Sequence, residues 1–116
     1  MADPYIGEIT AFAFDFAPEG WESCDGRTLK IVGNQVLFAL LGTQYGGDGK
    51  TTFMLPDLRG RIPVGRGAAN GVELEQGKIA SFVSDDTASA PVDDKSTGTL
   101  ALNFCIAVNG TFPSRW

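Results

Sequence analysis

The sequence of 116 residues contains no histidine. This absence removes the commonest general base and the usual partner of a nucleophilic serine or cysteine. Carboxylates could act in pairs instead, and the visible pairs are Asp85-Asp86 and Asp93-Asp94. Because adjacent residues on a strand point to opposite faces, neither pair could flank one bond. The sequence therefore predicts a protein that is not an enzyme and has no catalytic residue.

Cysteine is also scarce, and Cys24 and Cys105 lie far apart in the chain. A zinc site needs closely spaced cysteines or histidines to complete it, and neither is present. Two alternatives stay open for the pair. A disulfide would close a loop of about 80 residues and stabilise the fold by roughly 3 to 5 kcal/mol. Two reduced thiols would instead serve as small buried apolar side chains.

Long apolar runs and basic clusters are missing as well. No run approaches the ~20 residues of a membrane-spanning helix, and the first residues lack the charged and apolar regions of a secretory signal. The net charge of −5 comes from one segment, residues 73–94, in which Lys78 is the only base. Its acids are Glu73, Glu75, Asp85, Asp86, Asp93 and Asp94. This distribution argues against nucleic acid as a partner. No cofactor is predicted, with calcium at the carboxylates of Asp85, Asp86, Asp93 and Asp94 as the alternative.

Glycine, by contrast, is abundant, and its densest stretch is residues 42–61, GTQYGGDGKTTFMLPDLRGR. The GGDGKTT within it looks like a phosphate-binding loop. That loop needs a glycine where this chain has Gln44, and it must connect a strand to a following helix. Here Pro56 follows a short apolar run, which cannot begin a helix. The stretch is therefore predicted to be a fixed irregular loop, shaped by Gly46, Gly47 and Gly49, and not a nucleotide site.

Residue patterns place the first strands. A strand is predicted over residues 5–14, which are rich in β-branched and aromatic side chains. Two more strands are predicted over residues 21–24 and 27–31. They flank Asp25-Gly26, a dipeptide suited to the positive φ angles of a two-residue hairpin turn. The sequence therefore predicts a hairpin here.

A helix of about two turns is predicted next, with Asn34 as its N-cap and Gly42 as its left-handed stop. Its apolar residues fall at helical spacing and are Val36, Leu37, Leu40 and Leu41. A helix this short must pack on a sheet to be stable. A brief strand is predicted after the glycine-rich loop, at residues 52–55.

The last third of the chain divides into a polar segment and a strand. Residues 84–98 are nearly devoid of apolar side chains, which predicts an exposed loop or arm. Over residues 100–108 large apolar residues alternate with small ones, which predicts a strand with one large and one small face. The fold class predicted is α+β and mostly β, with antiparallel strands and hairpins, one short helix packed on the sheet and long irregular glycine-rich loops. One domain is predicted to span residues 1–116.

Four stretches together resemble a known family. They are PYIGEI at residues 4–9, FAPEGWESCDGRTL at 16–29, NQVLFALLGTQYGGDGKTTFMLPDLRGRIPVGRG at 34–67 and LNFCIAVNGTFPSRW at 102–116. The combination is similar to the phage tail collar domain, which occurs in tail fibre proteins and in the bacterial microcystin-dependent proteins. The resemblance implies a structural or adhesive assembly module and not a catalyst.

The chain departs from longer members of that family between the RGRIPVGRG region and the final strand. Those members carry an extended insert with histidines, which in trimeric tail fibres can bind metal along the shared axis. This chain has residues 77–98 there and no histidine. Metal-dependent trimerisation is therefore not carried over, and no metal ligand is predicted.

The residues singled out are expected to act structurally. The clustered Arg59, Arg61 and Arg66 are expected to form internal ion pairs with the neighbouring Asp57, with an anion site as the alternative. Trp21 is expected to pack at the edge of the core, with stacking on a sugar as the alternative. For Trp116 three alternatives stay open, which are core packing, sugar stacking and contact with a neighbouring subunit. The full set of structural and assembly residues is Trp21, Cys24, Asp25, Gly26, Gly46, Gly47, Gly49, Pro56, Asp57, Arg59, Arg61, Leu102, Phe104, Cys105, Ile106 and Trp116.

The partner expected is the protein itself, through strand addition at an edge or arm near Tyr5 or Thr99. A contact that closes would give a ring or trimer, and one that does not close would give a fibre. The location expected is a virion or the extracellular space. The alternative function is a glycan- or receptor-binding adhesive module that acts through Trp21 or exposed loops.

Overall fold

The computed structural model describes residues 3–69, 72–79 and 98–115. Contacts divide the chain into two compact units, one formed by Met1–Pro63 with Leu102–Trp116 and the other by Val64–Ala101. The first unit contains a three-stranded sheet, a two-stranded sheet and the helix, and the second contains a two-stranded sheet. The organisation as one domain stays a prediction.

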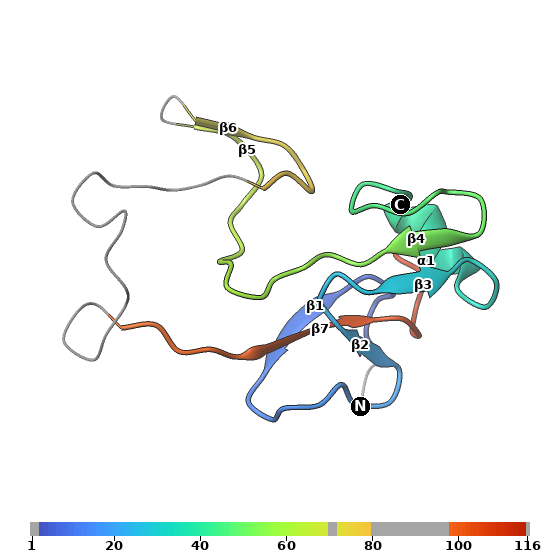
Figure 1. Ribbon diagram of the computed structural model, residues 1–116, viewed down its shortest axis with the longest axis horizontal. Coiled ribbons are helices and arrows are strands. Elements are labelled where there is room, and N and C mark those ends of the chain that lie inside the picture. The colour runs from blue at the N-terminus through green and yellow to red at the C-terminus, as the bar shows by residue number, and fades with distance from the viewer. Residues whose placement is uncertain (1–2, 70–71, 80–97, 116) are drawn as a thin grey trace. The chain divides into compact units, whose positions relative to one another are not determined.

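The main sheet of the first unit pairs a strand near the start of the chain with a strand near its end (Figure 1). Its order is β1-β7-β2, with β1 at Ile9–Phe12, β7 at Asn103–Ala107 and β2 at Trp21–Ser23, all antiparallel. The strand predicted over residues 5–14 is shorter in the structure, because the chain bends after Phe12. The strand predicted over 100–108 likewise begins only at Asn103, the residue paired with the last residue of β1.

The predicted hairpin around Asp25-Gly26 is wrong. Strand β2 pairs with β7, whereas β3, at Thr28–Lys30, pairs with β4, at Thr52–Met54, in a separate two-stranded sheet. Gly26 does adopt the positive φ expected of it, 76°. The turn geometry was therefore predicted correctly, but the turn carries the chain from one sheet to the other, because each flanking strand finds a partner distant in sequence.

The helix α1 spans Gln35–Leu41 and follows Asn34, as predicted. The Asn34 side chain makes no capping hydrogen bond. Its Nδ2 donates instead to the Lys30 carbonyl at 3.0 Å, so this part of the prediction is wrong. Gly42 ends the helix with φ 59°, and its N–H donates to the Phe38 carbonyl at 2.7 Å. The helix therefore stops at Gly42 with a positive φ as predicted, but the ψ of −142° is not that of a left-handed helical residue, so this part of the prediction is wrong.

The core of the first unit lies between the helix and the two sheets. Its buried cluster consists of Cys24, Leu37, Phe53, Leu55 and Ile106. Phe38 of the helix packs on Phe53 of β4, with ring centroids 5.5 Å apart, so the short helix is packed on a sheet as predicted. Burial of this apolar surface supplies the main stabilisation, at about 25 cal/mol per Å².

Both faces of β7 are buried at its centre, where Cys105, Ile106 and Ala107 are each at most 1% exposed. The small face predicted for this strand is therefore covered within the chain. Cys24 and Cys105 are free, buried thiols, which decides between the two alternatives for them. Burial is the main cause that raises the pKa of Cys24, to about 12, and it also raises the pKa of Cys105.

The second unit has the antiparallel pair β5, at Gly67–Ala69, and β6, at Val72–Leu74. The antiparallel strands, the single short helix and the long glycine-rich loops of the described residues confirm the predicted α+β, mostly β class. Within that part of the chain, no helix is both long and apolar enough to cross a membrane.

Candidate functional site

The turn between the two sheets meets the return of the central loop in the first unit. Asp25 forms an isolated antiparallel bridge with Asp57, and the Gly26 N–H donates to the Pro56 carbonyl at 3.3 Å. A Cβ added at Gly26 would lie only 3.2 Å from the Cβ of Asp57. Glycine is therefore needed twice over, for its positive φ and for this close approach. Four of the residues predicted to be structural are brought together here.

Each half of this junction carries the same Asp-x-Arg motif. In Asp25-Gly26-Arg27, the Arg27 Nε and Nη2 atoms donate to the two carboxylate oxygens of Asp25 at 3.0 and 2.9 Å. In Asp57-Leu58-Arg59, the Arg59 Nε and Nη2 atoms donate to Asp57 at 2.9 and 2.8 Å. In both motifs the arginine backbone N–H also donates to the aspartate. Bidentate pairs of this kind fix geometry as well as charge.

These hydrogen bonds determine the charge state of the junction. The side-chain hydrogen bond from Arg27 is the main cause that lowers the pKa of Asp25, and the one from Arg59 does the same for Asp57. Arg27 also pairs with Glu22 at 2.7 Å, and Arg61 lies 3.9 Å from the Asp57 carboxylate. The predicted pairing of Asp57 is thus present with Arg59 and Arg61. These guanidinium groups are engaged within the protein rather than left for an external anion. Among the residues that the structure describes, Arg66 forms no ion pair, so the prediction is wrong for this residue.

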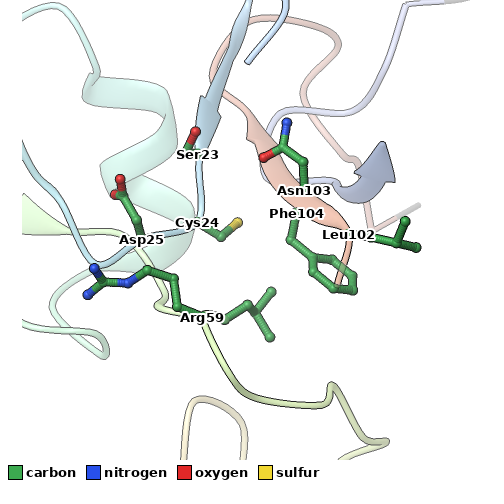
Figure 2. Close-up of a pocket in the computed structure, with 8 residues that line it drawn as sticks. Ser23, Cys24, Asp25, Arg59, Leu102, Asn103 and Phe104 are labelled. Atoms are coloured by element: carbon green, nitrogen blue, oxygen red, sulfur yellow. The ribbon is translucent and has the colours of Figure 1, made fainter. Parts of the chain in front are cut away.

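A pocket of about 240 Å³ opens beside this junction. In Figure 2 the Cys24 thiol and the Phe104 ring lie on opposite sides of it. Its wall is mostly apolar near β7, while Asp25 and Arg59 give it a charged side. The lining residues are Ser23, Cys24, Asp25, Leu58, Arg59, Leu102, Asn103 and Phe104. Because the charged groups pair with their own neighbours and the thiol has a raised pKa, the pocket offers no activated nucleophile or base.

The glycine-rich loop is held by one side chain. The Asp48 carboxylate accepts hydrogen bonds from the backbone N–H groups of Lys50, Thr51 and Thr52, at 2.8, 2.8 and 2.9 Å. These bonds, the one from Thr52 first, lower the pKa of Asp48 well below its usual range. Gly47 is pressed against the next strand, because a Cβ there would overlap the Cα of Phe53. The prediction of a fixed irregular loop is supported by this geometry.

Sequence reasoning missed the role of Asp48, although an Asp-Gly pair in a tight loop is a signal for such side-chain capping. It also missed an aromatic series that follows β1. The rings of Phe12 and Phe14 stack at 4.8 Å and those of Phe14 and Phe16 lie 4.7 Å apart. The alternation of phenylalanine in residues 12–16 could have indicated it, because alternate residues of an extended chain share one face.

Some predicted positions fall outside the described residues. They include Trp116 and almost all of the polar arm at residues 84–98. The carboxylates considered for calcium at residues 85, 86, 93 and 94 are also outside them. Among the residues that the structure describes, no group of three or more histidines, cysteines or acids is placed to hold a metal ion.

Comparison with known proteins agrees with this scaffold-like architecture. Residues 7–63 match the family model described as Phage Tail Collar Domain. The matched region includes β1 to β4, the helix, the glycine-rich loop and both Asp-x-Arg motifs. No curated protein matches the chain.

Proposed function

Because residues 7–63 belong to the phage tail collar domain family, we propose that the protein is a non-enzymatic structural module that assembles with copies of itself. The collar family is one of structural modules. The assembly proposed is a homo-oligomer or fibre, located in a virion or in the extracellular space.

The single observation that carries self-association is the free edge of β1. In the order β1-β7-β2, β1 is a terminal strand, and among the described residues no strand pairs with its other edge. Its sequence, Ile-Thr-Ala-Phe, contains no charge and no proline. Proteins usually protect exposed edges with lysine, proline or a bulge, since an unprotected edge is a template for another strand. This edge lacks the first two protections.

Apolar surface lies on and beside the same strand. Ile9 is 41% exposed, and the aromatic series continues from the strand with Phe14 at 40% and Phe16 at 61% exposed. Ile9 lies on the other face of β1 from Phe12, on whose ring Phe14 stacks. Exposed apolar side chains are therefore found on both faces at this edge, and exposed apolar surface marks interaction sites. Addition of a neighbouring copy's strand to β1 would satisfy its backbone groups and could cover these side chains in one contact. A two-fold contact would close as a dimer, whereas a head-to-tail contact would continue as a fibre.

The test compares the size of the assemblies formed by the wild-type protein with that of the assemblies formed by a variant with one substitution in β1. Light scattering and negative-stain electron microscopy of the purified protein should show oligomers or fibres. Ile9→Lys puts a charge on the proposed edge and should shift the population toward monomers. Val32→Lys is the matched control, because Val32 is 80% exposed in the turn before the helix and should leave assembly unchanged.

Two results would contradict the proposal. A wild-type protein that remains monomeric at high concentration would remove self-association altogether. Assemblies equally unaffected by Ile9→Lys and Val32→Lys would leave self-association in place but move it away from β1.

A further inference from the structure

A second pocket of the first unit lies where three chain segments meet, and none of the structural roles above uses it. Its volume is about 370 Å³. It is formed by the N-terminal segment, the turn before β2 and the turn after β7. Its lining residues are Asp3, Pro4, Glu19, Gly20, Trp21, Asn109 and Gly110.

Backbone hydrogen bonds hold the walls of this pocket together. The Asn109 N–H donates to the Gly20 carbonyl at 3.2 Å, and the Thr111 N–H donates to the Pro4 carbonyl at 2.8 Å. Gly110 packs so closely that a Cβ there would overlap the Pro4 carbonyl oxygen. The three segments are therefore fixed relative to one another by the fold, as in most ligand pockets. A pocket formed in advance does not have to order these segments when a ligand binds.

The polar side chains of the pocket differ from those at the Asp-x-Arg junction. Among the described residues, the carboxylates of Asp3 and Glu19 and the amide of Asn109 have no hydrogen-bond or ion-pair partner. Asp25 and Asp57, by contrast, are engaged by neighbouring arginines. The pocket thus presents acceptors and an amide donor that are available to a ligand.

Trp21 supplies the apolar part of the same pocket. It is partly buried on β2, and an edge-on contact with Phe12, at a centroid distance of 5.2 Å, holds the ring in place. The indole N–H is a further donor. An aromatic ring beside unpaired carboxylates and an amide is suited to a polyhydroxylated ring. The C–H face of such a ring packs on the indole, while its hydroxyls donate to the carboxylates and accept from the amide.

We infer that this pocket binds a neutral saccharide. Charge narrows the ligand class, because two carboxylates without a basic residue in the lining repel phosphate and acidic sugars. A metal ion is disfavoured as the ligand, because the described residues contain no group of three or more histidines, cysteines or acids placed to hold one. The volume lies at the low end of the roughly 300 to 1,000 Å³ typical of ligand pockets, which suits a glycan of one or two rings. This inference goes beyond the proposed structural function and does not depend on self-association.

The experiment is a titration of the isotope-labelled protein followed by amide NMR. The probes are the methyl glycosides of glucose, galactose, mannose and N-acetylglucosamine. The expected result is shift changes at the Trp21 indole N–H and at the amides of Gly20, Asn109 and Gly110 with at least one probe. Glucuronic acid and calcium chloride, added separately, should not reproduce them.

Substitutions test the assignment of the groups. Glu19→Ala should weaken binding of the responding glycoside by about tenfold, since it removes a hydrogen bond to a charged acceptor. Asp15→Ala is the matched control, because Asp15 is an exposed acid that does not line the pocket, and it should leave binding unchanged. Backbone amide spectra report folding of both variants. The inference is overturned if no probe shifts these signals, if calcium alone does so, or if both variants bind as the wild type does.

Discussion

Asp48 holds Thr51 through both oxygens of its carboxylate: the Thr51 N–H donates to Oδ1 at 2.8 Å, and Thr51 Oγ1 donates to Oδ2 at 2.9 Å. The N–H groups of Lys50 and Thr52 donate to Oδ1 as well. Successive backbone N–H groups of this kind are what a phosphate-binding loop offers to an external anion. In GGDGKTT the internal carboxylate of Asp48 occupies the position that a phosphate would take in such a loop.

The first prediction is that Asp48→Asn lowers stability and flattens its dependence on acid. The amide presents one acceptor oxygen without charge, so the set of hydrogen bonds cannot be kept. Because folding lowers the pKa of Asp48, its contribution is fully present above the ordinary aspartate pKa. That contribution is lost as the pH falls through about 4 toward the lower folded pKa. Thermal unfolding midpoints measured from neutral to acidic pH should therefore fall less steeply for the variant.

The control for this prediction is Asp15→Asn, which removes an exposed acid in the same unit. Its unfolding midpoint at neutral pH should match that of the wild type. A variant at Asp48 that retains the full stability of the wild type would show that the loop is held in some other way.

The second prediction concerns two glycines that both have positive φ. Gly47 has φ 98°, and a Cβ there would overlap the Phe53 Cα and lie 2.8 Å from the Thr52 carbonyl oxygen. Gly60 has φ 66°, and a Cβ there would meet nothing within 4 Å. Gly60→Ala should therefore lower the free energy of unfolding by about 1 to 2 kcal/mol through backbone strain alone.

Gly47→Ala should lower the free energy of unfolding by more than about 3 kcal/mol, because it adds a clash with the backbone to the same strain. Urea denaturation of the two variants measures the difference directly. Equal losses for the two substitutions would mean that the loop can move away from β4, and the close approach at Gly47 would then not be a constraint on the fold.

The local features of this fold could be predicted from the sequence, whereas the pairing of its strands could not. The helix over Gln35–Leu41, its stop at Gly42 and the positive φ of Gly26 depend on neighbouring residues, and the structure agrees with each. Strand β2 has three residues and pairs with β7, which is more than 80 residues away. So short a strand has no periodicity to indicate a partner. The Asp25-Gly26 turn is compatible with a hairpin or with a crossover, and only the distant partners decide between them.

In the candidate sites, too, features local in sequence could be predicted, whereas contacts between distant segments could not. The ion pairs of Asp57 with Arg59 and Arg61 are local in sequence and were predicted. The pocket lined by Trp21 joins three segments through backbone contacts between Pro4 and Thr111 and between Gly20 and Asn109. Those contacts follow from the order β1-β7-β2, in which a strand near the start of the chain pairs with a strand near its end. No motif in the sequence indicates these contacts, because each segment contributes only two or three lining residues.

The last prediction uses the buried thiol of Cys24, which is 3% exposed. Burial raises its folded pKa from 9.0 to about 12. Between these values the unfolded chain releases the proton while the folded chain keeps it, so the stability present below pH 9 is lost as the pH rises. From about pH 8 to about pH 10, this one group should lower the free energy of unfolding by roughly 1 kcal/mol.

Cys24→Ala removes that linkage and keeps every other titrating group, Cys105 included. Urea denaturation at the two pH values should therefore show a smaller loss of stability for the variant than for the wild type, whatever the absolute stability of each. Iodoacetamide provides an independent readout, because a thiol that stays protonated and buried reacts slowly until the chain unfolds. An identical pH dependence in the two proteins, or rapid alkylation of Cys24 in the folded state, would show that this thiol is accessible to water rather than part of the core between the sheets and the helix.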